Sequence, residues 1–343
     1  MKAVYLKEPG DISIQEIPVP VFSEGNALIR IKSMSICGSD IGAYRGVNPH
    51  VRYPRVIGHE LAGVVEEIGE NAKGIKPGDR VVIEPYVFCG KCYPSSQGRT
   101  NCCEHLQTLG VHRDGGMTEL LLHPAHMLVK LPDDVPWELA PLSEPLTIAL
   151  HGLHRAKLQE GQHIAINGAG AIGLLAALAA IAYGATPILI DMVEERLAFA
   201  RSLGVQHTTH PGDEAARYIR ELTNGRGAEV VMEASGANAA IRASLDLVSF
   251  AGKVVLTGWP KKPTELPTDI ITTKELDVLG GRNSAREFEE ALELIRTKKV
   301  DVRAILSKVV TLDEVPEMVR EQTQNPGKYL KVVALADGCD CTK

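Results

Sequence analysis

The sequence predicts an α/β protein of two domains, a barrel-like β domain followed by a doubly wound parallel sheet. Up to about residue 146, short alternating or apolar runs are punctuated by glycine and proline, which is typical of a β domain. From about residue 147 to residue 284, apolar β-rich runs alternate with helical stretches, which is typical of a parallel sheet. The length of 343 residues suits two domains.

The first domain is predicted from strand-like runs separated by turn residues. These runs lie at residues 26–31, 63–68, 80–84 and 117–122. Much later in the chain, an amphipathic helix over 286–298 and a final strand over 329–335 follow the second domain. The tail 337–343 comes after that strand, and we expect it to be a disordered end.

The second domain is predicted from apolar strands that alternate with helices. The strands are expected at 163–166, 187–190, 229–233 and 253–257, and the helices at 174–183, 192–203 and 237–249. The glycine-rich run from Asn167 to Gly173 joins the first strand to the first helix, with glycines at the G-x-G-x-x-G spacing. Asp191 ends the second strand about twenty residues later, where it would bond ribose hydroxyls and repel a 2′-phosphate, so NAD is favoured over NADP.

A second motif supplies metal ligands. A thiolate (Cys37), an imidazole (His59) and a carboxylate (Glu60 or Glu144) suit a borderline-soft ion, and three protein ligands leave a fourth position open. Such an ion acts as a Lewis acid toward an alcohol oxygen, whose carbinol hydride can pass to a nicotinamide. The two motifs together predict metal-assisted hydride transfer.

Composition and charge exclude several other classes of protein. A formal net charge of −6 argues against a nucleic-acid partner, and no run approaches the eighteen or so apolar residues of a membrane helix. The first residues lack the apolar region of a signal peptide, so we expect a cytoplasmic protein. The seven cysteines are odd in number and clustered, unlike a secreted disulfide framework.

Nearly the whole chain, from Met1 to about Ala336, resembles the zinc-dependent medium-chain dehydrogenase/reductase superfamily, and its polyol, threonine and sugar-acid branch in particular. The resemblance implies a GroES-like catalytic domain at 1–146 and 285–343 and a Rossmann NAD-binding domain at 147–284. The motifs that carry it are Ile36-Cys37-Gly38-Ser39-Asp40, Pro54-Arg55-Val56-Ile57-Gly58-His59-Glu60, Gly78-Asp79-Arg80-Val81, Cys89-Gly90-Lys91-Cys92, Asp114-Gly115-Gly116, Ser143-Glu144-Pro145 and the glycine loop.

The cysteine cluster departs from the family pattern. The family's second, structural zinc uses four cysteines that map onto Cys89, Cys92, position 95 and Cys103, within a lobe at 89–103. Position 95 is Ser95, and a hydroxyl is a poor zinc ligand beside three thiolates. The departure leaves this site empty, weakened, or completed by Cys102 or water.

The resemblance also implies roles for residues around the catalytic zinc and the cofactor. Ser39 is placed to accept the alcohol proton, or alternatively to cap the helix that begins near Asp40. Glu60 and Glu144 compete for the third ligand position, and we expect both near the metal, one of them bound through water. The implied cofactor residues are Gly168, Gly170, Ala171, Ile172, Gly173, Asp191, Arg196, Ser235, Gly236, Arg282 and Asn283.

A second departure concerns the proton relay. Many relatives have histidine where this chain has Gly42. Tyr44, His50, His112 or water would have to take its place.

The substrate is the least determined feature of the sequence. The stretches 98–103 and 110–116 look most like enzymes that oxidise aldonates such as L-galactonate or L-gulonate at C5. Arg45, Arg52 and Arg113 lie on loops that the resemblance puts near the substrate, and a guanidinium group matches a carboxylate. We therefore expect a sugar acid or polyol as substrate and a homodimer or homotetramer as the assembly.

Two alternatives to a sugar-acid or polyol dehydrogenase remain from the sequence. One is an L-threonine 3-dehydrogenase with the same fold, metal and cofactor, and another is a non-catalytic NAD-binding protein. The latter is disfavoured by the complete set Cys37, His59, Glu60 and Glu144, and the same set disfavours a zinc-free quinone reductase.

Overall fold

The computed structural model describes residues 1–70 and 73–336, and the expected disordered tail lies outside this range. The described chain divides into two compact units. The first contains Met1–Glu144, Phe288–Arg296 and the described part of Val302–Lys343, and the second contains Pro145–Glu287 and Thr297–Asp301. Residues 145–146, 285–287 and 297–301 thus belong to the second unit.

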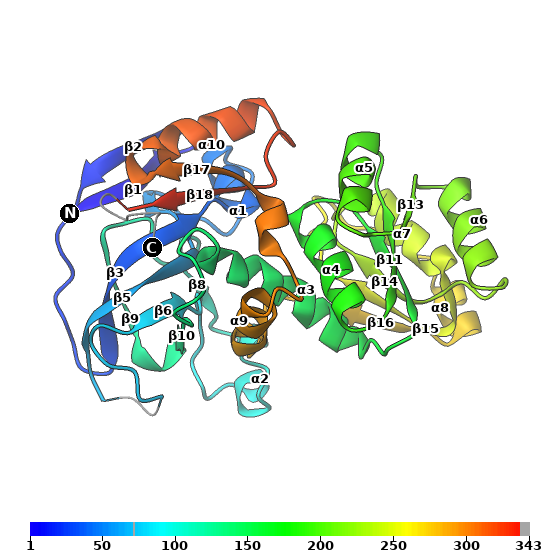
Figure 1. Cartoon of the computed structure of the whole chain (residues 1–343), viewed down its shortest axis with the longest axis horizontal. Helices are drawn as coiled ribbons and strands as arrows, with labels where there is room; N and C mark the ends of the chain where they lie inside the picture. Colours follow the sequence, from blue (N-terminus) through cyan, green and yellow to red (C-terminus); the bar gives the residue numbers. More distant parts are fainter. Residues whose placement is uncertain (71–72, 337–343) are drawn as a thin grey trace. The chain divides into compact units, whose positions relative to one another are not determined.

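The first unit is built mainly of β-structure (Figure 1). Its largest sheet has the order β10-β6-β5-β3-β18-β17, with β9 also paired to β3. The strands of this sheet are β3 (Asn26–Ser35), β5 (Glu60–Ile68), β6 (Arg80–Ile83), β9 (Leu120–Pro124), β10 (Leu128–Lys130), β17 (Leu306–Thr311) and β18 (Lys331–Leu335). Smaller sheets contain β1 (Lys2–Glu8), β2 (Asp11–Glu16) and β4 (Arg55–Val56), and β7 (Tyr86–Val87) with β8 (Gln107–Thr108).

Short helices connect the strands of the first unit. These are α1 (Gly38–Tyr44), α2 (Tyr93–Ser96), α9 (Phe288–Arg296) and α10 (Val315–Gln324), with single 3₁₀ turns η1 (Thr100–Cys102), η2 (Ala125–Met127), η3 (Ala140–Leu142), η4 (Val302–Ile305) and η5 (Leu312–Glu314). In β3, alternate residues Ala27, Ile29 and Ile31 are buried, which is the period-two pattern of a strand with one face in the core. The helix α3 (Ser143–Ala156) begins at the end of this unit.

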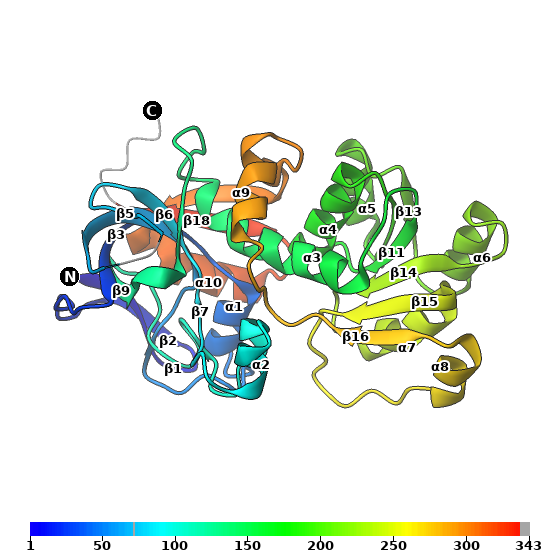
Figure 2. The same cartoon turned by 90° about the horizontal axis from the view of Figure 1, so that it is seen from below.

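The second unit is a doubly wound parallel sheet, as predicted. Its order is β13-β12-β11-β14-β15-β16, formed by β11 (His163–Asn167), β12 (Thr186–Ile190), β13 (His207–Thr209), β14 (Ala228–Glu233), β15 (Val248–Leu256) and β16 (Asp277–Gly280). Figure 2 shows helices on both faces of this sheet. They are α4 (Ala171–Ala182), α5 (Glu194–Ser202), α6 (Asp213–Leu222), α7 (Asn238–Leu247) and α8 (Thr268–Lys274).

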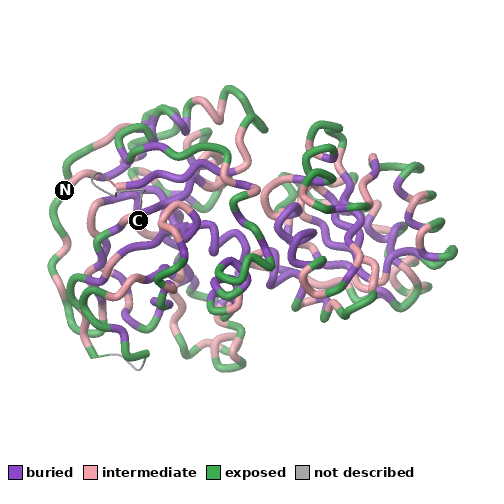
Figure 3. The backbone as a smooth tube through the Cα atoms, in the orientation of Figure 1, coloured by how far each residue is buried: buried purple, intermediate pink, exposed green. Residues whose placement is uncertain are grey.

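Burial explains why the central strands of the second unit are uniformly apolar. Both faces of a parallel sheet are covered by helices, so its strands need no polar face. Residues Ile188, Leu189 and Ile190 of β12 are all buried, and Figure 3 shows the same pattern in the purple interior of this unit. The strand order reverses between β11 and β14, and ligands of such sheets bind at the carboxyl ends beside that point.

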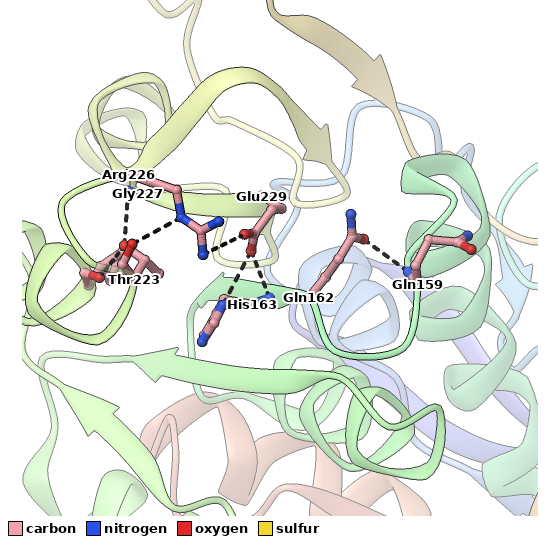
Figure 4. A network of polar contacts seen from close by, with 8 residues as sticks. Gln159, Gln162, His163, Thr223, Arg226, Gly227 and Glu229 are labelled. Carbon is pink, nitrogen blue, oxygen red and sulfur yellow. Dashed lines mark hydrogen bonds and ion pairs between the residues drawn. The ribbon is translucent and has the colours of Figure 1, made fainter.

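The opposite, amino ends of β11 and β14 are joined by polar contacts (Figure 4). The Glu229 carboxylate accepts a 2.9 Å hydrogen bond from the His163 backbone N–H and lies 3.7 Å from Arg226. Gly227 N–H donates to the Thr223 hydroxyl at 3.0 Å. These contacts fix the sheet at the end away from the glycine loop.

One predicted strand is displaced. The run 117–122 is expected as a strand, whereas β9 covers Leu120–Pro124. The reason is tertiary, because the Met117 N–H donates to the Ile57 carbonyl at 3.1 Å and Thr118 forms only an isolated bridge with Ala3. In the described part of the chain, no helix is long and apolar enough to cross a membrane.

Candidate functional site

Three side chains of types that can bind a metal ion converge in the first unit. Because Ser35 at the end of β3 pairs with Glu60 at the start of β5, Cys37 lies beside His59. One ligand atom each from Cys37, His59 and Glu60 lies within 4.8 Å of the other two. His59 and Glu60 are buried, and Cys37 is half-buried.

The chemistry of these donors fits a borderline-soft ion such as zinc. The buried Nδ1 of His59 has no hydrogen-bond partner among the described residues, which is costly unless something binds there. Burial by itself lowers the pKa of His59, but the neighbouring Cys37, Asp40 and Glu144 raise it well above its ordinary value. An imidazole surrounded by anionic groups is an environment that favours a cation.

Asp40 joins the two segments that carry Cys37 and His59. One of its carboxylate oxygens accepts the Cys37 backbone N–H at 2.9 Å, and the other accepts the Gly58 N–H at 3.3 Å. The side chain is buried, and burial raises its pKa. Sequence reasoning assigned Asp40 no role, although its place in the first turn after Cys37 is the capping-box position.

Glu60 is paired with a buried lysine that sequence reasoning also missed. Lys331 Nζ forms an ion pair with one carboxylate oxygen of Glu60, and the Ser35 hydroxyl donates to the other. Burial lowers the pKa of Lys331, but the charges of Glu60 and Cys37 raise it above its ordinary value. Lys331 is 5% exposed at the start of β18, so its ammonium balances negative charge inside the site.

Glu144 lies close by but outside the three-donor group. It is buried in the first turn of α3, and its carboxylate accepts the hydroxyl of Tyr86 on β7. Burial and the charge of Glu60 raise the pKa of Glu144 to about 7. The choice of Glu60 or Glu144 as third ligand stays a prediction.

Ser39 is not the cap of α1. The helix begins at Gly38, its N-cap is Cys37, and Asp40 completes the capping box, so the capping alternative for Ser39 is wrong. The buried Ser39 hydroxyl has no hydrogen-bond partner among the described residues. It is therefore available to a ligand near Cys37.

Two of the substitutes for the missing relay histidine, His50 and His112, lie close together. Gly42 lies within α1, where an added Cβ would meet only ordinary contacts with Val47 and Asn48. The rings of His50 and His112 lie 6.0 Å apart.

The glycine loop lies between β11 and α4, at the point where the sheet order reverses. Gly170 is the N-cap of α4, and Ala171, Ile172 and Gly173 form its first turn. A Cβ on Gly173 would lie 1.8 Å from the Gly168 carbonyl oxygen, so only glycine fits there. The free N–H groups of such a turn are suited to a pyrophosphate.

Asp191 follows β12 and faces the same loop. Its two carboxylate oxygens accept the N–H groups of Ala169 at 2.7 Å and Val193 at 2.9 Å. Arg196 Nη1 lies 3.6 Å from the same carboxylate.

The loop after β14 is also at this end of the sheet. An added Cβ on Gly168 would lie 3.0 Å from that of Ser235, so the two loops are in contact. The buried Glu233 carboxylate accepts the N–H groups of Ser235 at 2.9 Å and Gly236 at 3.1 Å, which fixes this loop. Arg282 and Asn283 follow β16, and both are half-buried.

The cysteine lobe brings together three of its four candidate thiols. Ligand atoms of Cys89, Cys92 and Cys103 lie within 4.8 Å of one another, a group of described donors that does not include Cys102. The Ser95 hydroxyl lies 3.1 Å from the Cys92 sulfur.

The three arginines predicted to bind the substrate differ in exposure. Arg45 is the exposed C-cap residue of α1, Arg52 is exposed, and Arg113 is half-buried.

A dinucleotide-type parallel sheet together with a Cys/His/Glu group defines the class of zinc-type dehydrogenases. Residues 23–133 match the alcohol dehydrogenase GroES-like domain, and residues 171–297 match the zinc-binding dehydrogenase family. An uncharacterized zinc-type alcohol dehydrogenase-like protein of Haemophilus influenzae is 53% identical, and the match covers 98% of each chain. The chain therefore belongs to the zinc-type alcohol dehydrogenase family of the medium-chain superfamily and is an oxidoreductase.

More distant relatives have named substrates. Sorbitol dehydrogenase of Bacillus subtilis is 32% identical, over 97% of this chain and 96% of its own. L-Galactonate-5-dehydrogenase of Escherichia coli is 32% identical, over 90% of this chain and 91% of its own. Among solved structures, an alcohol dehydrogenase of Escherichia coli CFT073 complexed with NADH has a TM-score of 0.91 and 31% identity, covering 98% of this chain and 99% of its own.

Proposed function

We propose that this dehydrogenase oxidises a secondary alcohol of a sugar acid or polyol to a ketone with NAD⁺, using zinc held by Cys37, His59 and either Glu60 or Glu144. The observation that carries this proposal is that one ligand atom each from Cys37, His59 and Glu60 lies within 4.8 Å of the other two. The buried His59 Nδ1, which has no hydrogen-bond partner among the described residues, supports it. When bound, zinc polarises the alcohol oxygen and NAD⁺ accepts the hydride.

Ser39 is the group proposed to receive the alcohol proton. Its hydroxyl is buried, has no partner among the described residues, and lies two positions after Cys37. A serine that passes its proton onward needs a further acceptor. With glycine at position 42, we assign that step to Tyr44, His50, His112 or water.

Asp191 is proposed to select NAD⁺ over NADP⁺. Its carboxylate is oriented by two backbone N–H groups of the cofactor-binding end of the sheet, and it would bond ribose hydroxyls. Arg196 and the Ser235–Gly236 loop are proposed to contact the cofactor as well, together with Arg282 and Asn283.

The choice of a sugar acid rests on charge. Arg113 is half-buried and Arg45 is exposed, and either guanidinium group would match a substrate carboxylate. The likeness to an L-galactonate dehydrogenase supports an aldonate, and the likeness to sorbitol dehydrogenase supports a polyol.

The test is NADH formation with L-galactonate, L-gulonate, sorbitol and L-threonine. Cys37→Ser should abolish turnover, whereas Cys102→Ser, which alters a thiol outside both donor groups, should leave it unchanged. Arg113→Met should raise KM for an aldonate and leave KM for sorbitol unchanged. Turnover of L-threonine alone would contradict the proposal that the substrate is a sugar acid. If the protein binds zinc and NAD⁺ but turns over none of these compounds, the proposal that it oxidises a sugar acid or polyol is contradicted.

A further inference from the structure

A buried glutamate that the proposed reaction does not use lies beside two histidines of α3. One carboxylate oxygen of Glu287 lies 2.8 Å from Nδ1 of His151 and 3.5 Å from Nδ1 of His154. Burial by itself raises the pKa of Glu287, but hydrogen bonds from the two histidines lower it to about 2. The carboxylate is therefore charged in the folded protein, and it binds the end of its own segment to α3.

The other oxygen of this carboxylate holds a strained part of the chain. It accepts the backbone N–H of Ala285, two residues before Glu287. Within the segment 281–286, the backbone is left-handed at Asn283, with a φ of 52°, and at Arg286, with a φ of 78°. Residues with side chains adopt this conformation only where surrounding contacts hold them in it. Glu287 supplies such contacts at the end of the segment.

The start of the segment is fixed by β15 and again by α3. The Gly281 N–H donates to the Leu256 carbonyl at 2.8 Å, at the end of β15. One residue earlier, the Gly280 carbonyl accepts the Nε–H of Arg155 from α3 at 3.0 Å. The helix α3 therefore contacts the chain on both sides of this strained segment.

The segment follows β16, at the carboxyl end of the sheet. The strands β15 and β16 lie on one side of the point where the strand order reverses, and β12, which precedes Asp191, lies on the other. The two halves of a dinucleotide bind on the two sides of such a point. Since Asp191 is the residue proposed for the adenosine ribose, Arg282 and Asn283 are on the side of the nicotinamide half.

We propose that Glu287 is a positioning residue for the nicotinamide half of the cofactor. Held by the two histidines of α3, it keeps the segment 281–286 in one conformation before NAD⁺ binds. The inference rests on the proposed contacts of Arg282 and Asn283 with the cofactor, because Glu287 acts through them. If the segment were free to sample other conformations, only the competent fraction of molecules would bind NAD⁺, and the apparent Kd would rise accordingly.

The experiment measures the binding of NAD⁺ and of AMP to the full chain by calorimetry. AMP contains only the adenosine half of the cofactor, so its Kd reports whether the rest of the binding site is intact. The variants are Glu287→Gln, which removes the charge, and His151→Leu, which removes the nearer donor. Glu289→Gln is the matched control, since Glu289 is an exposed acid two residues further along the chain.

We expect Glu287→Gln and His151→Leu to raise the Kd of NAD⁺ about tenfold and to leave the Kd of AMP unchanged. Glu289→Gln should match wild type with both ligands. Arg282→Met should also raise the Kd of NAD⁺. In that background, Glu287→Gln should raise it by a smaller factor than in wild type, because part of its effect passes through Arg282.

Three outcomes would overturn the inference. If Glu287→Gln binds NAD⁺ as tightly as wild type while Arg282→Met and Asn283→Ala bind it more weakly, only the positioning role is wrong. If Glu287→Gln weakens NAD⁺ and AMP equally, its effect is on the fold as a whole. If Arg282→Met and Asn283→Ala both bind NAD⁺ like wild type, the proposed cofactor contacts of these residues fail, and the positioning role fails with them.

Discussion

The buried ammonium group of Lys331 stays charged because it pairs with the carboxylate of Glu60. A lysine that is 5% exposed would normally lose its proton, yet here it meets the carboxylate of Glu60, whose other oxygen accepts the Ser35 hydroxyl. Breaking such a pair leaves an uncompensated buried charge, which is more costly than never having had the pair.

Lys331→Met should therefore lower the free energy of unfolding by about 3–5 kcal/mol. Adding Glu60→Gln should recover at least about 1 kcal/mol of that loss, since no unpaired carboxylate then remains. Urea unfolding of all four proteins in a double-mutant cycle, with chelator present so that metal content is equal, measures the coupling. Additive effects of the two substitutions would show that the pair carries no coupling energy.

His123 predicts a pH dependence outside the metal site. It is fully buried on β9, its Nε2 bonds the Glu84 carbonyl at 2.9 Å, and burial lowers its pKa to about 3. Between pH 6.5 and 3 the unfolded chain binds a proton that the folded protein does not. Stability is therefore full above pH 6.5 and falls by up to about 1.4 kcal/mol per pH unit below it.

His123→Gln keeps an N–H donor but removes this titration. From pH 7 to pH 5, wild type should lose about 2 kcal/mol more unfolding free energy than the variant. Urea titrations at both pH values measure the difference, with His105→Gln, at an exposed site, as the control. Parallel losses in wild type and His123→Gln would contradict the assignment.

At the scale of elements, Asp40 of α1 connects the segments that carry Cys37 and His59. Asp40→Ala removes the acceptor for both Cys37 and Gly58, so it should lower stability by about 1 kcal/mol and zinc affinity by about 10–100-fold. Glu314→Ala is the matched control, because it removes a similar capping box with Thr311 at η5. Chelator competition should show a change in affinity for Asp40→Ala only, and equal effects in both variants would argue against the connecting role.

Glycine can have two roles in the glycine loop: it allows close packing of the backbone at Gly173, and it leaves room for the cofactor at Gly170. Gly173→Ala places a methyl group 1.8 Å from the Gly168 carbonyl, whereas an added Cβ on Gly170 meets nothing within 4 Å. Gly173→Ala should therefore lower the melting temperature, and Gly170→Ala should leave it unchanged while weakening NAD⁺ binding, because the backbone approaches the pyrophosphate there. Calorimetric binding and thermal unfolding measure the two effects, and a loss of stability in Gly170→Ala would contradict this division.

Periodicity predicted the elements of the parallel sheet well because burial dominates their sequences. The strand β12 and the helix α4 are nearly all apolar, so pattern alone identifies them. The strand β9 was misplaced because Met117 bonds Ile57 across the unit, a contact between distant segments that no local pattern contains. Local sequence patterns therefore predict the type of an element, helix or strand, more accurately than its first residue.

At the scale of the whole molecule, each unit has its own core. Ile29, Met34 and Leu61 are buried in the first unit, and Ile188, Val231 and Val254 in the second. Because a ligand stabilises the structure that binds it, NAD⁺ at 100 times its Kd should stabilise the second unit by about 2.7 kcal/mol. Scanning calorimetry should show NAD⁺ raising one transition and a chelator lowering another, whereas one transition moved by both reagents would contradict independent cores.

The convergence of the candidate ligand motifs could be predicted because these motifs are short and chemically distinctive. Cys37, His59 and Glu60 converge as a group, with Cys37 on one segment and His59 adjacent to Glu60 on another. Lys331 could not be predicted, since a single lysine before an apolar strand looks like any surface residue. Its position follows from the pairing of β18 with β3, which joins opposite ends of the chain.

That pairing also sets an order of events during synthesis. Glu60 leaves the ribosome 271 residues before Lys331, its only described ion-pair partner, and domains begin to fold from the N-terminus. Until β18 emerges, Glu60 in the nascent first unit has no counter-ion from Lys331. A chain truncated before β18 would retain that carboxylate without this counter-ion, so the charge balance at Glu60 depends on a residue made 271 positions later.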